Sequence, residues 1–280
     1  MTIRPSHLFP AAIAAALALA LGACGTIEKE PAAGSSADPS AGTSSAPASD
    51  PAGIETVKAG VLTVCTNPPY APFEEVLNNE VVGFDMDLTA EVAADLGLTV
   101  EFVQAPFESI ESAASLDTGT CDVGASALTI TPERQAKMEF SQPYYQTTMG
   151  LLVKAESGIS DLAGLADKPV GVQQGTTGED CANQQPELTQ IKQYESLGDQ
   201  VTALKAGDVV GIFNDEPTLT PYIDEGFTVV SSFDTGEAFG FAVKQGNQGL
   251  LEAINATLDR VNSDGTYESL IEKWFQSSAQ

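Results

Sequence analysis

The 280-residue chain has a single histidine, His7, and few basic residues. His7 lies close to the N-terminus, and the rest of the chain contains no histidine. That part of the chain therefore cannot carry a Ser-His-Asp or Cys-His mechanism, nor a histidine-ligated metal site. Twelve lysines and arginines stand against 39 acidic residues, which gives a formal net charge of −27. This charge argues against binding to nucleic acid or to anionic lipid, and it indicates solubility. We therefore expect no cofactor, no metal and no nucleic-acid partner.

The N-terminus has the pattern of an export signal. Arg4 is followed by an apolar stretch from Leu8 that is rich in Ala and Leu and too short to favour a stable membrane span. It ends in LGAC at Cys24, which resembles the bacterial lipoprotein box, in which the cysteine is lipidated. Residues 1–23 are thus expected to be a lipoprotein signal peptide, with Cys24 anchoring the protein outside the cytoplasmic membrane. The alternative is an ordinary secretory cleavage beside an incidental cysteine.

The next segment, residues 24–54, predicts a disordered tether. From Gly25 to Gly53 it consists mainly of Ala, Ser, Pro, Gly and Thr, with almost no large apolar side chains. Such a segment cannot bury enough apolar surface to offset the entropy lost on ordering. A coil of this length reaches on the order of 30 Å, enough to hold a domain just off a membrane.

The remaining chain alternates strand and helix patterns. The first half predicts strands at 61–66, 99–104 and 122–130, with helices at 84–97 and 107–116. This order predicts an α/β fold with a parallel sheet and right-handed crossovers. The pattern restarts after Tyr145, with strands expected at 149–154, 169–173, 209–213, 228–230 and 239–244, helices at 201–206 and after Pro217, and two long helices at the end.

Cysteine supplies a further expectation. Export implies an oxidising environment, and three cysteines remain after Cys24, so at most one bridge forms within the folded part. Cys65 and Cys121 lie on strands expected to be parallel neighbours, whereas Cys181 lies on a helix in the other half. We expect a Cys65–Cys121 disulfide with Cys181 free, provided that their Cα atoms are within about 7 Å.

Residues 121–145 contain the strongest local signal for a binding site. Thr131 and Pro132 form a helix start, which places Arg134 in the first turn. A cation there is unfavourable beside the positive end of the helix, and an anion bound between them would relieve this. Arginine can also grip a carboxylate through two bonds. The alternative is a solvated surface arginine.

Seven motifs together resemble the extracytoplasmic amino-acid-binding proteins of ABC importers, over about residues 62–275. They are PPYAPFE (68–74), VGFDMDL (82–88), LTITPER (128–134), FSQPYY (140–145), VGVQQGTTGE (170–179), FNDEP (213–217) and DGTYESLIEKWF (264–275). The resemblance implies a two-lobed, type II periplasmic-binding-protein fold, in which two parallel or mixed sheets are joined by two crossing strands. Lobe 1 would comprise residues 55–145 plus 241–280, and lobe 2 residues 146–240, closing around a ligand.

The resemblance also implies roles for individual residues. Arg134 would hold the ligand α-carboxylate, helped by the backbone N–H groups of Thr129 and Thr177. Asp215 would hold the α-ammonium, beside Ser126 or the Ala127 carbonyl, although alone it could be a solvated turn residue. The full expected ligand-binding set is Asn67, Tyr70, Phe73, Phe107, Ser126, Ala127, Thr129, Arg134, Gln173, Thr176, Thr177 and Asp215, with Tyr70, Phe73 and Phe107 around the ligand side chain.

Two departures from the family pattern bear on the ligand. Asn67 stands where many members have an acidic residue, and Gln173 where some relatives have a basic one. Two neutral amides suit a neutral polar side chain, so a glutamine-, asparagine- or glutamate-like amino acid is expected. The expected partners are this amino acid and an ABC permease, and the protein is expected to be a monomer.

Two other functions stay open at this point. Some proteins with this fold catalyse eliminations from small acids, and Asp215 could serve as the base of such a dehydratase. The protein could also be an amino-acid sensor lipoprotein that has lost transport.

Overall fold

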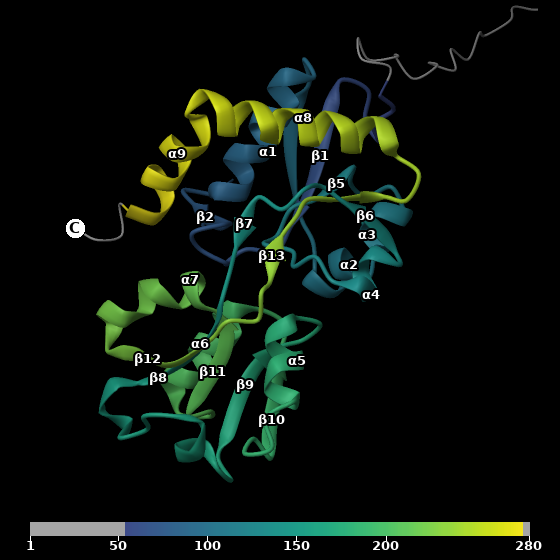
Figure 1. Ribbon diagram of the computed structural model, residues 1–280. Coiled ribbons are helices and arrows are strands. Elements are labelled where there is room, and N and C mark those ends of the chain that lie inside the picture. The colour runs from purple at the N-terminus through teal and green to yellow at the C-terminus, as the bar shows by residue number, and fades with distance from the viewer. Residues whose placement is uncertain (1–53, 277–280) are drawn as a thin grey trace, which may run out of the picture. The chain divides into compact units, whose positions relative to one another are not determined.

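A computed structural model describes residues 54–276, which form two five-stranded sheets (Figure 1). The expected signal peptide, the Cys24 anchor and the tether up to residue 53 lie outside the described residues. Ile54, assigned to the tether from the sequence, is instead buried and belongs to the main hydrophobic core. The folded part therefore begins at least one residue earlier than predicted.

The first sheet has the strand order β4-β1-β5-β14-β6. Its strands are β1 (Val61–Thr66), β4 (Thr99–Gln104), β5 (Val123–Gly124), β6 (Met138–Phe140) and β14 (Ala242–Lys244). Strands β4, β1 and β5 are parallel, as the alternating pattern predicts, whereas β14 runs antiparallel to β5 and β6. This lobe also holds α1 (Phe84–Asp95), α2 (Phe107–Glu111), α3 (Ala114–Asp117), α4 (Pro132–Gln135), α8 (Gln248–Asp264), α9 (Thr266–Ile271), the turn η4 (Glu272–Gln276) and the hairpin β2 (Glu75–Leu77) to β3 (Glu80–Val82).

The second sheet has the order β10-β9-β11-β8-β12. Its strands are β8 (Met149–Lys154), β9 (Pro169–Gln173), β10 (Gln190–Tyr194), β11 (Gly211–Asp215) and β12 (Phe227–Phe233). The three strands β10, β9 and β11 are parallel, and β8 is antiparallel to β11 and β12. The helical segments of this lobe are η1 (Ala155–Ser157), η2 (Leu162–Leu165), α5 (Thr177–Asn183), α6 (Leu197–Ala206), α7 (Glu216–Leu219) and η3 (Thr220–Glu225).

Two short strands connect the sheets. β7 (Tyr145–Gln146) and β13 (Ala238–Phe239) pair in an antiparallel way and run next to each other in Figure 1. In the chain, β7 lies between β6 of the first sheet and β8 of the second, and β13 lies between β12 of the second sheet and β14 of the first. This topology is the type II periplasmic-binding-protein fold, in which two mixed α/β sheets are joined by two crossing strands.

Several predicted elements differ in length. The strand expected at 122–130 ends at Gly124, because the chain leaves the sheet and Ala127 adopts a left-handed conformation (φ 44°). The helix expected at 107–116 is divided into α2 and α3 at Ala113, which is also left-handed (φ 70°). The strand expected at 239–244 is likewise divided between β13 and β14.

Candidate functional site

Eleven of the twelve residues expected to bind ligand line one cavity, here called the central cavity. They are Asn67, Tyr70, Phe107, Ser126, Ala127, Thr129, Arg134, Gln173, Thr176, Thr177 and Asp215. The first seven belong to the lobe of the first sheet and the last four to the lobe of the second. The space open to the centre of a water-sized sphere is about 10 Å³, so the side chains nearly fill the cavity. An amino acid therefore enters only if the two lobes move apart.

Phe73 is the exception, and the expectation that it contacts ligand is corrected. Its side chain is fully buried away from the central cavity. Its ring lies 5.0 to 5.4 Å, centroid to centroid, from the rings of Tyr145, Phe239 and Phe275. Aromatic rings at such distances pack favourably edge to face. The apolar environment of this cluster thus holds Phe73 in the core, while Tyr70, three residues earlier, reaches the cavity.

Arg134 is buried, which overturns the alternative of a solvated surface arginine. Its Nη1 donates to the Thr129 carbonyl and its Nη2 to the Gly175 carbonyl, both at 2.9 Å, and its guanidinium lies 5.5 Å from the Phe107 ring centroid. Thr131 caps α4 as predicted, since its Oγ1 accepts from the Arg134 N–H at 3.2 Å. The helix has only four residues, so its dipole contributes little, and the burial of Arg134 is the stronger argument for an anion site.

Arg134 forms only a long ion pair with a carboxylate of the protein. Its Nε lies 3.8 Å from Glu111 Oε2, which is long for a hydrogen bond. Burial lowers the pKa of Arg134, and the nearby carboxylates of Glu111 and Asp215 oppose that change. The two carbonyl bonds use two of the five N–H groups of a guanidinium. The remaining N–H groups suffice to bind a carboxylate through two bonds.

Asp215 is the buried acid of the central cavity, and the alternative of a solvated turn residue is wrong for this structure. It is the last residue of β11, not part of a loop beyond the strand as the sequence suggested. The Tyr70 hydroxyl donates to its Oδ2 at 2.5 Å, and the Thr147 hydroxyl to its Oδ1 at 3.0 Å. Burial raises the pKa of Asp215 to about 6, while these two hydrogen bonds act in the opposite direction.

Two further buried carboxyl groups lie directly behind the cavity, and sequence reasoning missed both. Glu74 Oε1 accepts from the Ser126 hydroxyl at 2.6 Å, and Asp85 Oδ2 accepts from the Ala127 N–H at 2.8 Å. Burial raises the pKa of Glu74 well above its usual value and that of Asp85 to about 7. Acidic residues inside the apolar stretches APFEEV and VGFDMDL were the available signal, because buried acids need partners.

Gly83 brings these two acids together. It has φ 149°, and a side-chain carbon there would lie 2.0 Å from the Phe73 carbonyl oxygen, so only glycine fits. The Asp85 N–H then donates to that carbonyl at 3.1 Å. The loop that carries Glu74 is thereby held against the start of α1. As a result, the Ser126 hydroxyl and the Ala127 N–H are oriented from behind.

An amide pair closes the cavity at the side of Asn67. Asn67 Nδ2 donates to the Ala105 carbonyl at 2.9 Å, and its Oδ1 accepts from Gln173 Nε2 at 3.2 Å. Gln173 Nε2 also donates to the Glu195 carbonyl at 3.3 Å. The two amides therefore connect the lobes by a direct hydrogen bond. Beyond them an outer cavity of about 580 Å³ shares Asn67 and Phe107 with the central cavity.

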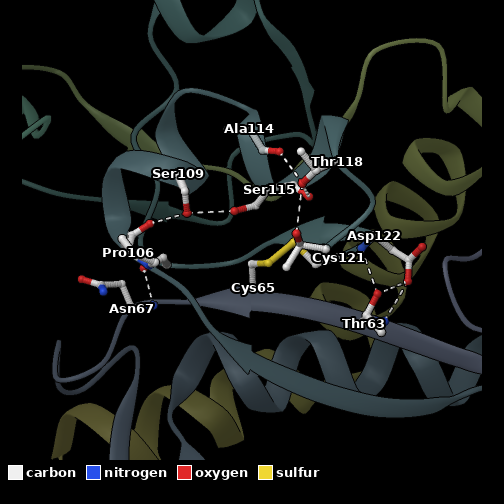
Figure 2. The surroundings of a disulfide bond; sticks show 12 residues. Thr63, Cys65, Asn67, Pro106, Ser109, Ala114, Ser115, Thr118, Cys121 and Asp122 are labelled. Atoms are coloured by element: carbon white, nitrogen blue, oxygen red, sulfur yellow. Dashed lines mark hydrogen bonds between the residues drawn. A yellow bond between two sulfur atoms is a disulfide. The ribbon is translucent and has the colours of Figure 1, made fainter.

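A disulfide connects two segments of the first lobe that lead to residues of the central cavity. Cys65 and Cys121 are bonded, with Cα atoms 5.7 Å apart, inside the limit set from the sequence, and Cys181 is free. Figure 2 shows Asn67 on one side of this bond and the hydrogen-bonded pair Thr63 and Asp122 on the other. The bridge thus links the segment before Asn67 to the segment that leads to Ser126.

Within 54–276 no group of three or more His, Cys, Asp or Glu side chains is placed to hold a metal ion. In the same range, no helix has both the length and the hydropathy of a membrane span. Arg134, Asp215 and the amide pair are the charged and amide groups that line the central cavity.

Two α/β lobes with polar groups converging on a cavity between them define a two-lobed solute-binding protein. Residues 62–277 match the model of the bacterial extracellular solute-binding proteins, family 3, so the chain belongs to this family. Among curated relatives, the ABC transporter arginine-binding protein 1 of Escherichia coli strain K12 is 31% identical over 217 residues, covering 74% of this chain and 87% of the relative.

Solved structures give the same result. An ancestral arginine-binding protein bound to glutamine has a TM-score of 0.73 at 35% identity and covers 77% of this chain and 98% of that one. An ancestral amino acid-binding protein that is a precursor of cyclohexadienyl dehydratase has a TM-score of 0.72 at 36% identity, covering 77% and 96%. The likeness thus extends over nearly the whole of each neighbour.

Proposed function

We propose that the protein binds a polar L-amino acid between its lobes and delivers it to the permease of an ABC importer. The observation that carries this proposal is the pair of opposite charges in one cavity: Arg134 comes from the first lobe and Asp215 from the second. An amino acid is a zwitterion with a carboxylate and an ammonium on one carbon. Arg134 suits the carboxylate and Asp215 the ammonium, so a single ligand draws both lobes together.

The other cavity residues complete this arrangement. The Ser126 hydroxyl donates to Glu74 and accepts from the Asn67 N–H at 3.2 Å, which leaves one lone pair for the ligand ammonium. The hydroxyls of Thr129 and Thr177 lie 3.4 Å apart across the two lobes, beside Arg134. We assign Tyr70 and Phe107 to the cavity walls on either side of the ligand. Asn67 and Gln173 are assigned to the end of the cavity that holds the ligand side chain.

Closure follows from the same contacts. Several hydrogen bonds cross between the lobes near the cavity, among them Tyr70 to Asp215, Gln173 to Asn67 and Arg134 to the Gly175 carbonyl. A ligand shifts the balance between open and closed forms only by its difference in affinity for the two. Because a ligand contacts both lobes only when they are closed, it stabilises the closed form that a permease would recognise.

Calorimetric titration with the twenty L-amino acids tests the proposal. At least one polar amino acid is expected to bind with a 1:1 stoichiometry, and mass spectrometry of ligand that copurifies with the protein would identify it. The absence of binding for all twenty, by a protein shown to be folded, would overturn the proposal.

A second candidate is an elimination enzyme, favoured by the structural neighbour that is a precursor of a dehydratase. Asp215, with a pKa raised by burial to about 6, could act as a base. However, the extra carboxyl groups Glu74 and Asp85 lie behind Ser126 and Ala127 and do not line the cavity. Product analysis after incubation with prephenate separates the two functions, and no product is expected. A sensor without transport would bind amino acid but support no uptake.

Membrane attachment forms a separate part of the proposal. We assign Cys24 as the lipidated residue that anchors the mature protein outside the cytoplasmic membrane, on the basis of the LGAC sequence. Fractionation tests it: the parent protein is expected with membranes, and the Cys24→Ser protein is not expected to be lipid-anchored. Membrane attachment of Cys24→Ser equal to that of the parent would contradict this assignment.

A further inference from the structure

The Asn67 and Gln173 amides have a fixed orientation, which determines what their free atoms can bind. Asn67 Nδ2 faces the Ala105 carbonyl, which only accepts, so Asn67 presents Oδ1 to Gln173. Gln173 must then present Nε2 to that oxygen, and the same Nε2 faces the Glu195 carbonyl. Two backbone carbonyl groups thus fix both amides, and neither can rotate by 180° without placing two acceptors together.

This orientation leaves Gln173 Oε1 with no hydrogen-bond partner among the described residues. The Gln173 side chain is 2% exposed and lines the central cavity. A buried acceptor without a partner costs free energy, and a ligand that donates to it recovers that cost. The side-chain end of the site therefore presents an acceptor whose orientation is fixed when the lobes are closed.

The charges around this end act in the same direction. Arg134 is the only basic side chain among the described residues that line the central and outer cavities. The proposed function already assigns it to the α-carboxylate. The outer cavity is lined instead by the exposed carboxylates of Glu108, Glu195 and Asp199. A ligand whose side chain carried a second carboxylate would face the free Gln173 oxygen and these like charges.

We propose that Gln173 makes the site selective for amino acids whose side chains donate hydrogen bonds, namely an amide NH₂ or a guanidinium, and that it rejects side-chain carboxylates. This inference rests on the proposed function, because it requires the α-carboxylate to occupy Arg134. It keeps the glutamine- and asparagine-like ligands expected from the sequence, excludes the glutamate-like ones, and adds a guanidinium side chain that the sequence did not predict. The outer cavity gives room for a side chain longer than that of glutamine.

Calorimetry at pH 7.5 with L-glutamine, L-arginine, L-glutamate and L-norvaline tests the selectivity. Glutamine, arginine or both are expected to bind roughly 100-fold more tightly than glutamate. Norvaline, which lacks any side-chain donor, is expected to bind about tenfold more weakly than glutamine. If glutamate binds as tightly as the better of glutamine and arginine, the inference is wrong while the proposed function stands. If no amino acid binds, both are wrong.

Two variants test the role of Gln173 itself. Gln173→Met removes the acceptor at similar volume, so the difference in affinity between glutamine and norvaline should shrink to less than about threefold. Gln173→Glu adds a charge and should raise the preference for arginine over glutamine by about tenfold. Gln190→Met is the matched control, because Gln190 is exposed and donates to the Asp167 carbonyl away from the cavity. A glutamine-to-norvaline ratio in Gln173→Met equal to that of the control would overturn the assignment.

Discussion

The two lobes hold their shares of the site in different ways. In the first lobe, Ser126 and Ala127 are fixed from behind by Glu74 and Asp85, and a disulfide lies below them. In the second lobe, Asp215 and Gln173 are the last residues of two strands. Both take hydrogen-bond partners from the first lobe, Tyr70 and Asn67 respectively.

This difference indicates that the two lobes contribute to ligand binding in different ways. The hydrogen bonds that orient Ser126 and Ala127 are internal to the first lobe and persist when the lobes separate, whereas Arg134 of this lobe loses its bond to the Gly175 carbonyl. The second lobe supplies groups that lose partners on opening and regain them on closing, either from the first lobe or from a ligand. Preorganisation reduces the entropic cost of binding, whereas groups that need partners make binding depend on closure.

Removing the disulfide should affect the first lobe strongly. Since Cys65 and Cys121 have a sequence separation of 56, the Cys65→Ala/Cys121→Ala protein is expected to lose about 4 kcal/mol of unfolding free energy. Urea unfolding followed by circular dichroism measures this loss. The control is Cys181→Ala, which removes a free cysteine of the second lobe and should change the unfolding free energy by less than about 1 kcal/mol. Equal urea midpoints for the parent, the double variant and Cys181→Ala would show that the disulfide does not stabilise the first lobe.

The buried Asp85 should make stability depend on pH. Its pKa is raised from 3.8 to about 7 by burial, so the folded protein binds the proton more tightly than the unfolded chain does. Its stabilising contribution is therefore complete below pH 3.8 and is lost as the pH rises through about 7. Relative to Asp85→Asn, the parent should lose up to about 4 kcal/mol between pH 4 and pH 8. Parallel curves of unfolding free energy against pH would show that Asp85 does not titrate in this way.

Arg134→Ala should lower amino-acid affinity by about 2–4 kcal/mol, because it leaves the ligand carboxylate buried without its charged partner. Solution scattering should also show the variant staying extended at ligand concentrations that close the parent. The matched control is Arg260→Ala, since Arg260 pairs with Glu91 and Asp95 between α8 and α1, away from the cavity. A variant that binds as tightly as this control would remove the basis for placing the carboxylate at Arg134.

Asp215 of the second lobe should make ligand affinity depend on pH, whereas Asp85 of the first lobe makes stability depend on pH. Asp215 has a pKa of about 6, and protonation removes the charge that attracts the ligand ammonium. Affinity should thus fall by roughly tenfold for each pH unit below about 6. In Asp215→Asn the affinity should be lower at pH 7.5 and nearly independent of pH between 7.5 and 4.5. Calorimetry across that range measures both curves, and a parent curve as flat as that of the variant would contradict the role of Asp215.

Much of the fold was predictable from residue patterns. The parallel strands β1, β4 and β9, the helix α1 and the first of the two long helices expected at the end, α8, are confirmed by the structure. The strand β10 and the hairpin of β2 and β3 were missed, because polar residues within them weaken the alternation that indicates a strand. The breaks at Ala113 and Ala127 were missed because alanine gives no signal for a left-handed backbone.

The site was predictable to a similar degree. The family resemblance predicted all eleven residues that line the central cavity. Seven of them lie in the quoted motifs, whereas Asn67, Phe107, Ser126 and Ala127 lie outside them. Phe73 was misplaced because Tyr70 and Phe73 lie in one Pro-rich loop, and the sequence does not tell which ring enters the core. The support from Glu74 and Asp85 depends on the close approach of two chain segments at Gly83, which no local pattern encodes.

Our proposal is that Arg134 and Asp215 clamp the two ends of one zwitterion across the lobes. It is tested most directly by calorimetry with the tightest-binding amino acid and its α-deaminated analogue, in the parent and in Asp215→Asn. In the parent, loss of the ammonium should cost about 2 kcal/mol or more of binding free energy. In Asp215→Asn, loss of the ligand ammonium should cost less than about 1 kcal/mol of binding free energy, because the carboxylate that attracts the ammonium is absent. An equal cost in both proteins would show that Asp215 does not hold the ammonium.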